Sequence, residues 1–246
     1  MRPPPRNRKA IREAQKGMER VLTSFFDQNK EKIIAPIVSA YSPLKSVKAD
    51  LTEAQIEALV EKYLDKADLD SFKALPKEVQ EYITAAAVDG GAAGLAAVRM
   101  DGIEELMNLV NAGAVKWAKE HSAELVTLIS DNTRNMIRSD VVQALENGWS
   151  NDKLKSALME STGFSKGRAE RIARTETAFA DMEANRLAYR ESGVVSKKVW
   201  LLGGNPCELC EANAEQGIIG IDDEWVSGDC PVHPNCECDE SPVIGD

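Results

Sequence analysis

All five cysteines of this 246-residue chain lie in one stretch, from Cys207 to Cys238. A pair of thiols with Cys-x-x-Cys spacing opens the stretch, and a His-x-x-Cys pair follows about twenty residues later. Two tight turns with this spacing supply four donors to one tetrahedral zinc ion. We therefore predict a structural zinc site, and its expected ligands are Cys207, Cys210, His233 and Cys236.

Six candidate donors compete for four coordination places. Cys238 is the first alternative ligand, because we expect only one of Cys236 and Cys238 to face the metal. Cys230 is the second alternative. Disulfides or free thiols are the other interpretation of the stretch. The odd number of cysteines, and a basic N-terminus that no apolar stretch follows, argue against a secreted disulfide-bonded domain.

A zinc ion with four protein ligands has no open position for an activated water molecule. The other histidine, His121, lies far upstream in a helical stretch, and we expect it on the surface. The sequence therefore predicts a protein that is not an enzyme. A zinc-dependent nuclease or a toxin-like domain is the enzymatic alternative, and it would need both an open metal position and a general base.

The net charge of −10 is concentrated at the C-terminus. No Lys or Arg follows Lys198, so residues 199–246 carry a charge of −11 and the first 198 residues +1. Such an acidic segment repels phosphate backbones, which disfavours a zinc finger that binds DNA. The acidic charge fits either simple solubility or docking on a basic protein. No apolar run approaches the ~20 residues of a membrane span, so we expect no membrane association.

The hydrophobic pattern predicts a mainly α fold. A multi-helix body precedes a small C-terminal zinc-stabilised α+β module. Expected segments are an N-terminal arm and helix (1–50), a helical body (51–193) and the Cys/His-rich module (194–246). The first helix should be interrupted near Pro36 and end in a turn at Ser42-Pro43.

Several local signals mark other element boundaries. Thr52 and Gln55 have capping-box spacing, and Gly148-Trp149-Ser150 indicates a helix end followed by a new N-cap. A long helix should run from Ser165 to Gly193, and a strand should cover 197–202. The glycines of the Ala/Gly-rich stretch either let two helices approach closely or break the helix, and both interpretations stay open: Gly90, Gly91 and Gly94.

On the predicted long helix, Glu176 falls on the apolar stripe and therefore needs a partner. Neither Arg171 nor Arg174 has the spacing of three or four residues that would align it with Glu176, so the partner should come from another segment. For Arg171, Arg174 and Glu176 a structural or a partner-binding role is predicted. With Lys166, the arginines Arg168, Arg171 and Arg174 should form a basic face that is solvated, touches packaged DNA or contacts an acidic protein.

A series of motifs occurs in a recognisable order: Gly148-Trp149-Ser150, Arg168-Ala-Glu-Arg-Ile-Ala-Arg-Thr-Glu-Thr-Ala178, Tyr189-Arg-Glu-Ser-Gly193, Lys198-Val-Trp200, Cys207-x-x-Cys210 and His233-Pro-Asn-Cys236-x-Cys238. In this order they resemble the head-morphogenesis, or minor capsid, proteins related to the F protein of bacteriophage Mu. The resemblance covers about residues 105–242. The family tends to carry acidic residues before the Cys pair, where this chain has Gly203-Gly-Asn-Pro206, so a contact made by those acids is absent or different here.

The resemblance implies a virion protein, present in few copies in the head interior or at the portal vertex, and in the host cytoplasm during assembly. Expected partners are the portal protein, the major capsid protein or both, with packaged DNA as a further candidate and no small-molecule substrate. A DNA-binding module that uses the Lys166–Arg174 face and the N-terminal arm is the remaining alternative.

Overall fold

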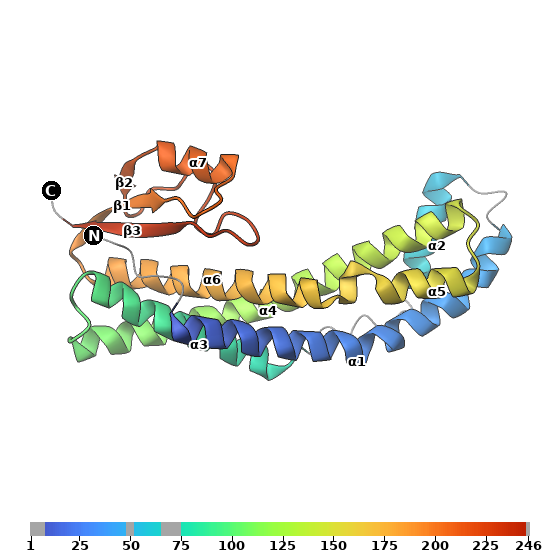
Figure 1. The fold of residues 1–246 in the computed structure, drawn as a ribbon, viewed down its shortest axis with the longest axis horizontal. Coiled ribbons are helices and arrows are strands. Elements are labelled where there is room, and N and C mark those ends of the chain that lie inside the picture. Colours follow the sequence, from blue (N-terminus) through green and yellow to red (C-terminus); the bar gives the residue numbers. More distant parts are fainter. Residues whose placement is uncertain (1–7, 48–51, 65–74, 245–246) are drawn as a thin grey trace. The chain divides into compact units, whose positions relative to one another are not determined.

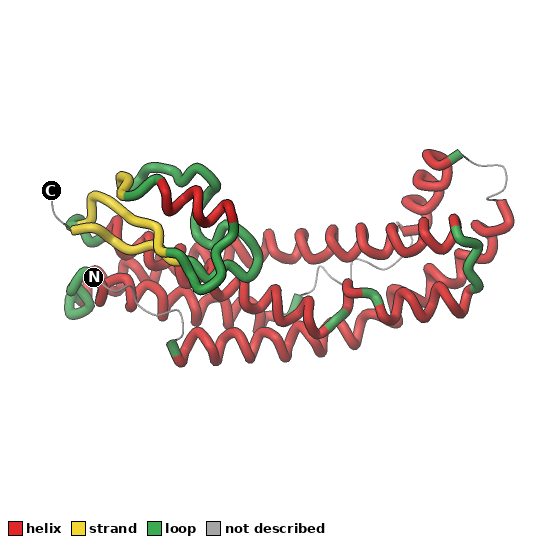
Figure 2. The backbone as a smooth tube through the Cα atoms, turned by 45° about the horizontal axis from the view of Figure 1, so that its top comes forward, coloured by secondary structure: helices red, strands yellow, loops and turns green. Residues whose placement is uncertain are grey.

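A computed structural model gives the fold of residues 8–47, 52–64 and 75–244 (Figure 1). The elements in chain order are α1 (Lys9–Val47), α2 (Glu53–Leu64), α3 (Lys77–Ala97), α4 (Glu104–Glu146), α5 (Asn151–Glu160), a 3-10 turn (Thr162–Phe164), α6 (Lys166–Glu191), β1 (Val195–Leu201), α7 (Glu208–Glu215), β2 (Ile218–Gly220) and β3 (Asp239–Ile244). The chain is thus mainly helical with a small C-terminal sheet, as predicted (Figure 2). Of the predicted N-terminal arm, residues 1–7 lie outside the described residues.

Two compact units divide the described chain. The first comprises Met1–Glu19, Lys77–Ser122 and Glu170–Asp246, and the second comprises Arg20–Pro76 and Ala123–Ala169. Each unit therefore combines segments that are far apart in the sequence. The division into 1–50, 51–193 and 194–246 stays a prediction.

Helix α1 is longer than predicted, because it continues through Pro36 and Pro43 to Val47. A proline removes one backbone hydrogen bond and is expected to interrupt a helix. Tertiary contacts offset this loss in the second unit, where Tyr41 is fully buried. Its hydroxyl donates hydrogen bonds to the carbonyls of Ala144 (2.8 Å) and Trp149 (3.0 Å). The predicted interruption and turn are therefore wrong.

The predicted caps are confirmed. The backbone N–H of Thr52 donates to Gln55 Oε1 (2.9 Å), which completes the capping box. Gly148 has a φ of +62°, and the Ser150 hydroxyl accepts the Lys153 N–H (3.1 Å) at the start of α5. Gly193 ends the long helix with a φ of +65°. These residues fix where the helices before the C-terminal module begin and end.

In the first unit, α3 packs against α6 at very short range. A Cβ atom added at Gly90 would lie 2.5 Å from the backbone oxygen of Asp181. At Gly94 it would lie 2.8 Å from the Ala188 Cβ. Both glycines are buried and helical. Of the two interpretations of the glycine stretch, close approach of two helices is therefore correct.

The three strands form an antiparallel sheet in the order β2-β1-β3. In Figure 1, β3 runs along α6, and α7 lies on the far side of the sheet from that helix. The predicted strand at 197–202 corresponds to β1, shifted by one or two residues. Trp200 of β1 and Trp225 of the loop after β2 meet edge to face, with ring centroids 5.4 Å apart. Met182 of α6 belongs to the same buried cluster, which joins sheet and helix.

Candidate metal centre

The two predicted ligand pairs sit on two turns of the C-terminal module. Cys207 caps α7, and its carbonyl accepts the Glu211 N–H (2.9 Å), so that Cys210 lies on the first turn of the helix. In the second turn the Cys236 N–H donates to the His233 carbonyl (3.1 Å). Asn235 makes this turn with a φ of +60°, a conformation that Asn tolerates better than most residues.

The fold brings five of the six candidate donors together around Cys210. Its sulfur lies 3.7 Å from Cys207 Sγ, 3.8 Å from Cys236 Sγ and 3.3 Å from His233 Nε2. Two groups of mutually close donor atoms share this sulfur: Cys207, Cys210 and His233, and Cys210, Cys236 and Cys238. All five cysteines are free thiols.

Two of the sulfur separations fit a tetrahedral metal ion. Two thiolates that are each about 2.3 Å from a zinc ion at the tetrahedral angle are about 3.8 Å apart. The observed sulfur separations of 3.7 and 3.8 Å agree with that value. They are far longer than a disulfide bond of about 2.05 Å. The donor set, soft sulfurs with one imidazole, is the set that zinc prefers in structural sites.

His233 is oriented by its own turn. Its Nδ1 lies 2.9 Å from the Pro234 carbonyl, which can only accept, so Nδ1 carries a proton. The other nitrogen, Nε2, faces Cys210. The hydrogen bond to Pro234 also raises the pKa of His233. Metal-binding histidines commonly hold the second ring nitrogen in this way, because it fixes the tautomer and the ring plane.

Hydrogen bonds and burial shift the pKa values of the thiols in different directions. The Cys230 thiol lowers the pKa of Cys236, although burial acts in the opposite direction. The backbone N–H of Cys210 lowers the pKa of Cys207. Burial raises the pKa of Cys210. N–H groups aimed at sulfur are typical of metal-binding thiolate turns, because they stabilise the deprotonated form that binds metal.

Cys230 and Cys238 differ in their surroundings. Cys230 is fully buried outside both donor groups, and its thiol donates to the Cys238 carbonyl (3.1 Å). Cys238 Sγ lies within the second group and accepts the Gly203 N–H (3.4 Å). Cys238 thus stays the alternative ligand, whereas Cys230 supports the loop.

A buried ion pair that the sequence analysis missed fastens the module to α6. Arg186 donates to Glu240 Oε1 (3.0 Å) and to the Cys230 carbonyl (3.1 Å). The same carboxylate oxygen accepts the Cys230 N–H (3.0 Å). The side chain of Arg186 is 6% exposed and that of Glu240 is 1% exposed. Arg186 and Glu240 are 54 residues apart in the sequence, so no local pattern predicts that they pair.

The carboxylate of Glu176 has a partner from another segment, as predicted. Glu176 Oε2 lies 2.5 Å from His121 Nε2 on α4. The His121 ring stacks on Trp117, with centroids 4.5 Å apart. His121 is therefore half-buried and bonded, and the prediction of a surface histidine is wrong. One residue away on α6, the Thr175 hydroxyl accepts the Asn235 N–H (3.3 Å), which links α6 to the second ligand turn.

The predicted basic face of α6 is wrong in one member. Arg168 is 4% exposed, and its guanidinium donates to Thr133 Oγ1 (2.7 Å) and the Ile129 carbonyl (3.0 Å) inside the second unit. Arg171 and Arg174 are exposed, and Arg174 pairs with Glu170 one helical turn away (2.7 Å). The DNA-binding alternative therefore loses one of its three arginines.

Part of the chain is similar to a family of known proteins. Residues 135–241 match the family described as Phage Mu protein F like protein. The predicted resemblance is confirmed for this segment. The match begins within α4 and extends through α6, both ligand turns and the first half of β3. The Phage Mu F-like family suggests a phage head-morphogenesis protein.

The chain is also similar to a protein of Bacillus subtilis (strain 168). The protein, named "Uncharacterized protein YqbB", is 29% identical over 170 residues, which cover 61% of this chain and 55% of the relative. The chain thus spans about half the length of that relative. No solved structure matches significantly. None of the helices in the described ranges has the length and apolar character needed to cross a bilayer.

Proposed function

We propose that this chain is a minor structural protein of a tailed-phage head, which joins the particle during assembly by docking on the portal protein, the major capsid protein or both. The observation that carries the proposal is the match of residues 135–241 to the Phage Mu F-like family. The helical part supplies the docking contacts, and the C-terminal module acts as a rigid element attached to α6. The protein is located in the head interior or at the portal vertex and, before assembly, in the host cytoplasm.

The proposal includes one structural zinc ion that holds the C-terminal module together. Its ligands are Cys207, Cys210, His233 and Cys236, and Cys238 is the alternative. Support comes from the sulfur separations around Cys210 and from the fixed orientation of the His233 ring. When bound, zinc supplies cross-links between two turns that have little regular structure of their own. Four protein ligands leave no place for catalytic water, which agrees with a structural role.

The direct test of the assembly role is quantitative mass spectrometry of purified phage particles. The proposal predicts that the intact chain is found in the particles, at a copy number far below that of the major capsid protein. Cross-linking before the analysis should join its lysines to the portal or major capsid protein. Particles that lack the chain at the sensitivity reached for the portal protein would contradict the proposed function.

A further inference from the structure

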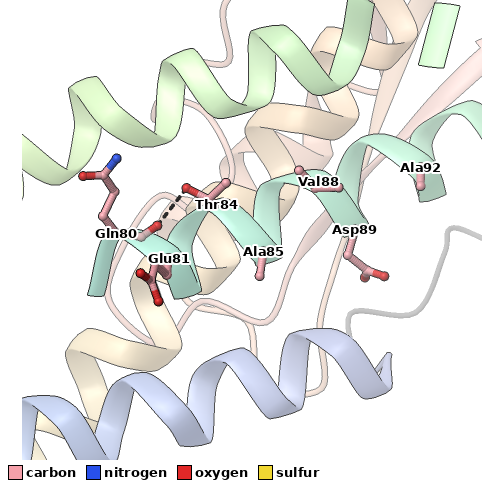
Figure 3. A pocket seen from close by; sticks show the side chains of 7 residues that line it. All are labelled: Gln80, Glu81, Thr84, Ala85, Val88, Asp89 and Ala92. Carbon is pink, nitrogen blue, oxygen red and sulfur yellow. Dashed lines mark hydrogen bonds between the residues drawn. The ribbon is translucent and has the colours of Figure 1, made fainter. Parts of the chain in front are cut away.

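Two surfaces of the first unit present apolar side chains to solvent. One is a face of α3 with a cavity of about 630 Å³, whose lining side chains are shown in Figure 3. Most of these side chains are small: Thr84, Ala85, Val88 and Ala92. Of the two acids on this face, Asp89 is already paired with Arg8 (2.5 Å). Such short side chains offer no projecting anchor, so the α3 face indicates no particular occupant.

The other surface lies on the C-terminal module and carries large aliphatic side chains. Leu209 of α7 is 48% exposed, Ile218 of β2 is 58% exposed and Val226 of the loop after β2 is 68% exposed. In Figure 1, α7 lies on the far side of the sheet from α6, so the helix does not cover this part of the module. Single exposed aliphatic side chains are common, whereas a group of them on one side of a small module indicates a binding surface.

Hydrogen bonds place these three side chains on one side of the module. Leu209, Asn213 and Gln216 are spaced by four and three residues, so they line one face of α7 over about 10 Å. The loop after β2 follows this face, because the Val226 N–H donates to Gln216 Oε1 (2.7 Å) and the next N–H donates to Asn213 Oδ1 (2.8 Å). Ile218 comes two residues after Gln216, where the face ends. We call Leu209, Ile218 and Val226 the α7 patch.

The charge around the α7 patch is negative. Exposed acids lie on α7 and in the loop after β2: Glu208, Glu211, Glu215, Asp222, Asp223 and Glu224. No Lys or Arg follows Lys198 in the sequence, and the side chain of Lys198 is 3% exposed and lies 3.8 Å from Asp229. DNA and a second acidic module would be repelled, and the first 198 residues of another copy carry a charge of only +1. The complementary partner is therefore a basic surface of another protein.

We propose that the α7 patch is a docking surface for a basic segment of another protein. The segment covers the three aliphatic side chains with apolar side chains of its own, and it places Lys or Arg beside the glutamates of α7. In the assembled particle this segment belongs to a head protein, and that identity of the partner rests on the proposed function. The patch adds a second contact to those of the helical part. Because the contact is small, it binds weakly by itself, and the charges mainly orient the encounter.

The surface is tested by methyl NMR on the full-length chain, with a synthetic twelve-residue peptide that repeats Leu-Lys-Lys-Leu as the probe. The peptide should shift the methyl resonances of Leu209, Ile218 and Val226 and leave those of Val88 on the α3 face unchanged. A peptide with Ser in place of each Leu keeps the charge and should bind roughly tenfold more weakly, because the apolar contact is lost. Equal binding of the two peptides, or shifts at Val88 without shifts in the α7 patch, would overturn the proposal.

Variants of the chain test which side chains bind the peptide. Leu209→Ala should weaken binding roughly fivefold, since part of the apolar contact is removed. Leu109→Ala is the matched control, because Leu109 of α4 is 52% exposed and lies outside the module. Val226→Ser should weaken binding by a similar factor at a position that is not next to the candidate ligand Cys210. Unchanged binding in both patch variants, or an equal loss in Leu109→Ala, would contradict the docking surface.

Zero-length cross-linking of purified particles tests the identity of the partner. A carbodiimide joins carboxylates to lysines that contact them, so Glu208, Glu211 or Glu215 should be joined to lysines of a neighbouring head protein. If the particles contain the chain but its cross-links come from the helical part alone, the α7 patch is not a docking surface and the proposed function still holds. Particles without the chain would contradict the proposed function and this partner, and the peptide experiments would then decide the surface by themselves.

Discussion

The α3–α6 contact and the C-terminal module belong to one unit but are stabilised in different ways. The helices meet through glycines of α3, so that the α3 backbone packs directly on α6. The module has one eight-residue helix and three short strands, and its buried cluster consists largely of tryptophans and cysteines. The first region derives stability from close packing, whereas the second depends on a few polar groups and, in our proposal, on a metal ion.

This contrast explains why single substitutions should act differently in the two regions. Close packing distributes stability over many contacts, so one added methyl group has a limited cost. A coordination site or a buried ion pair concentrates stability in single atoms, so removing one partner leaves the others uncompensated. We therefore expect the largest effects in the module.

The largest expected effect follows from Cys210→Ser, because both donor groups share Cys210. The variant should lose its zinc, and the module should unfold while the helices remain. Trp200 and Trp225 are buried there, so tryptophan emission should shift to longer wavelength with helical circular dichroism nearly unchanged. Cys230→Ala is the comparison variant: Cys230 lies outside both groups, so the metal should be retained, although loss of the hydrogen bond to Cys236 raises the pKa of that thiol and should weaken binding. A Cys210→Ser protein with one equivalent of zinc would disprove the ligand assignment.

The next effect concerns the ion pair that fastens the module to α6. Arg186→Leu leaves Glu240 buried without its partner, which should cost about 3–5 kcal/mol of unfolding free energy. Arg190→Ala is the matched control, because Arg190 and its partner Asp222 are solvent-exposed and the pair should contribute at most about 1 kcal/mol. Urea unfolding measures both. Equal losses of unfolding free energy in the two variants would show that burial does not determine how much each ion pair stabilises the fold.

A smaller effect is expected where the two helices meet. Gly90→Ala forces a Cβ atom to within 2.5 Å of the Asp181 carbonyl oxygen, and should lower stability by about 1–3 kcal/mol. Gly102→Ala is the control, since an added Cβ there meets nothing within 4 Å. Thermal unfolding should show a lower Tm for Gly90→Ala than for Gly102→Ala. If Gly90→Ala is as stable as the native chain, the close approach of α3 and α6 is wrong.

The smallest effect concerns Asp140 of α4, in the second unit. Burial raises the pKa of Asp140 above the ordinary value of 3.8, although a hydrogen bond from Ser161 acts in the opposite direction. A carboxyl group whose folded-state pKa is raised reduces stability when it is ionised, and this cost disappears as pH falls below the ordinary pKa. Asp140→Asn should therefore raise Tm by a few degrees at pH 7, and by less as pH approaches 4. The exposed Asp131→Asn should change Tm little at either pH; an equal gain there would contradict the prediction.

Local signals predicted much of the fold, because they depend on neighbours in the sequence. The Thr52 and Ser150 caps and the glycine after α6 are set by backbone geometry within a few residues. Likewise, the fold brings together all four predicted ligands and Cys238, since each ligand pair lies within one turn. Whether these residues bind zinc stays a prediction that the structure does not test.

Long-range contacts account for what the sequence analysis got wrong or missed. His121 seemed a lone surface residue because its partner, Glu176, lies 55 residues away. The burial of Arg168 depends on the Ile129 carbonyl and the Thr133 hydroxyl of α4, which no helical periodicity reveals. In α1 the prolines predicted breaks, but tertiary packing outweighed the local preference. The sequence pattern does not show which distant residues meet, so these contacts can be read only from the folded structure.

X-ray absorption at the zinc edge of the purified chain, combined with metal quantitation, tests the metal centre most directly. One zinc per chain is expected, with three sulfur neighbours at about 2.3 Å and one nitrogen neighbour at about 2.0 Å. Four sulfur neighbours would replace His233 by Cys238 and leave the structural role intact. A chain purified under reducing conditions that holds no metal after zinc is supplied, or a zinc ion with oxygen neighbours from solvent, would contradict a closed structural site.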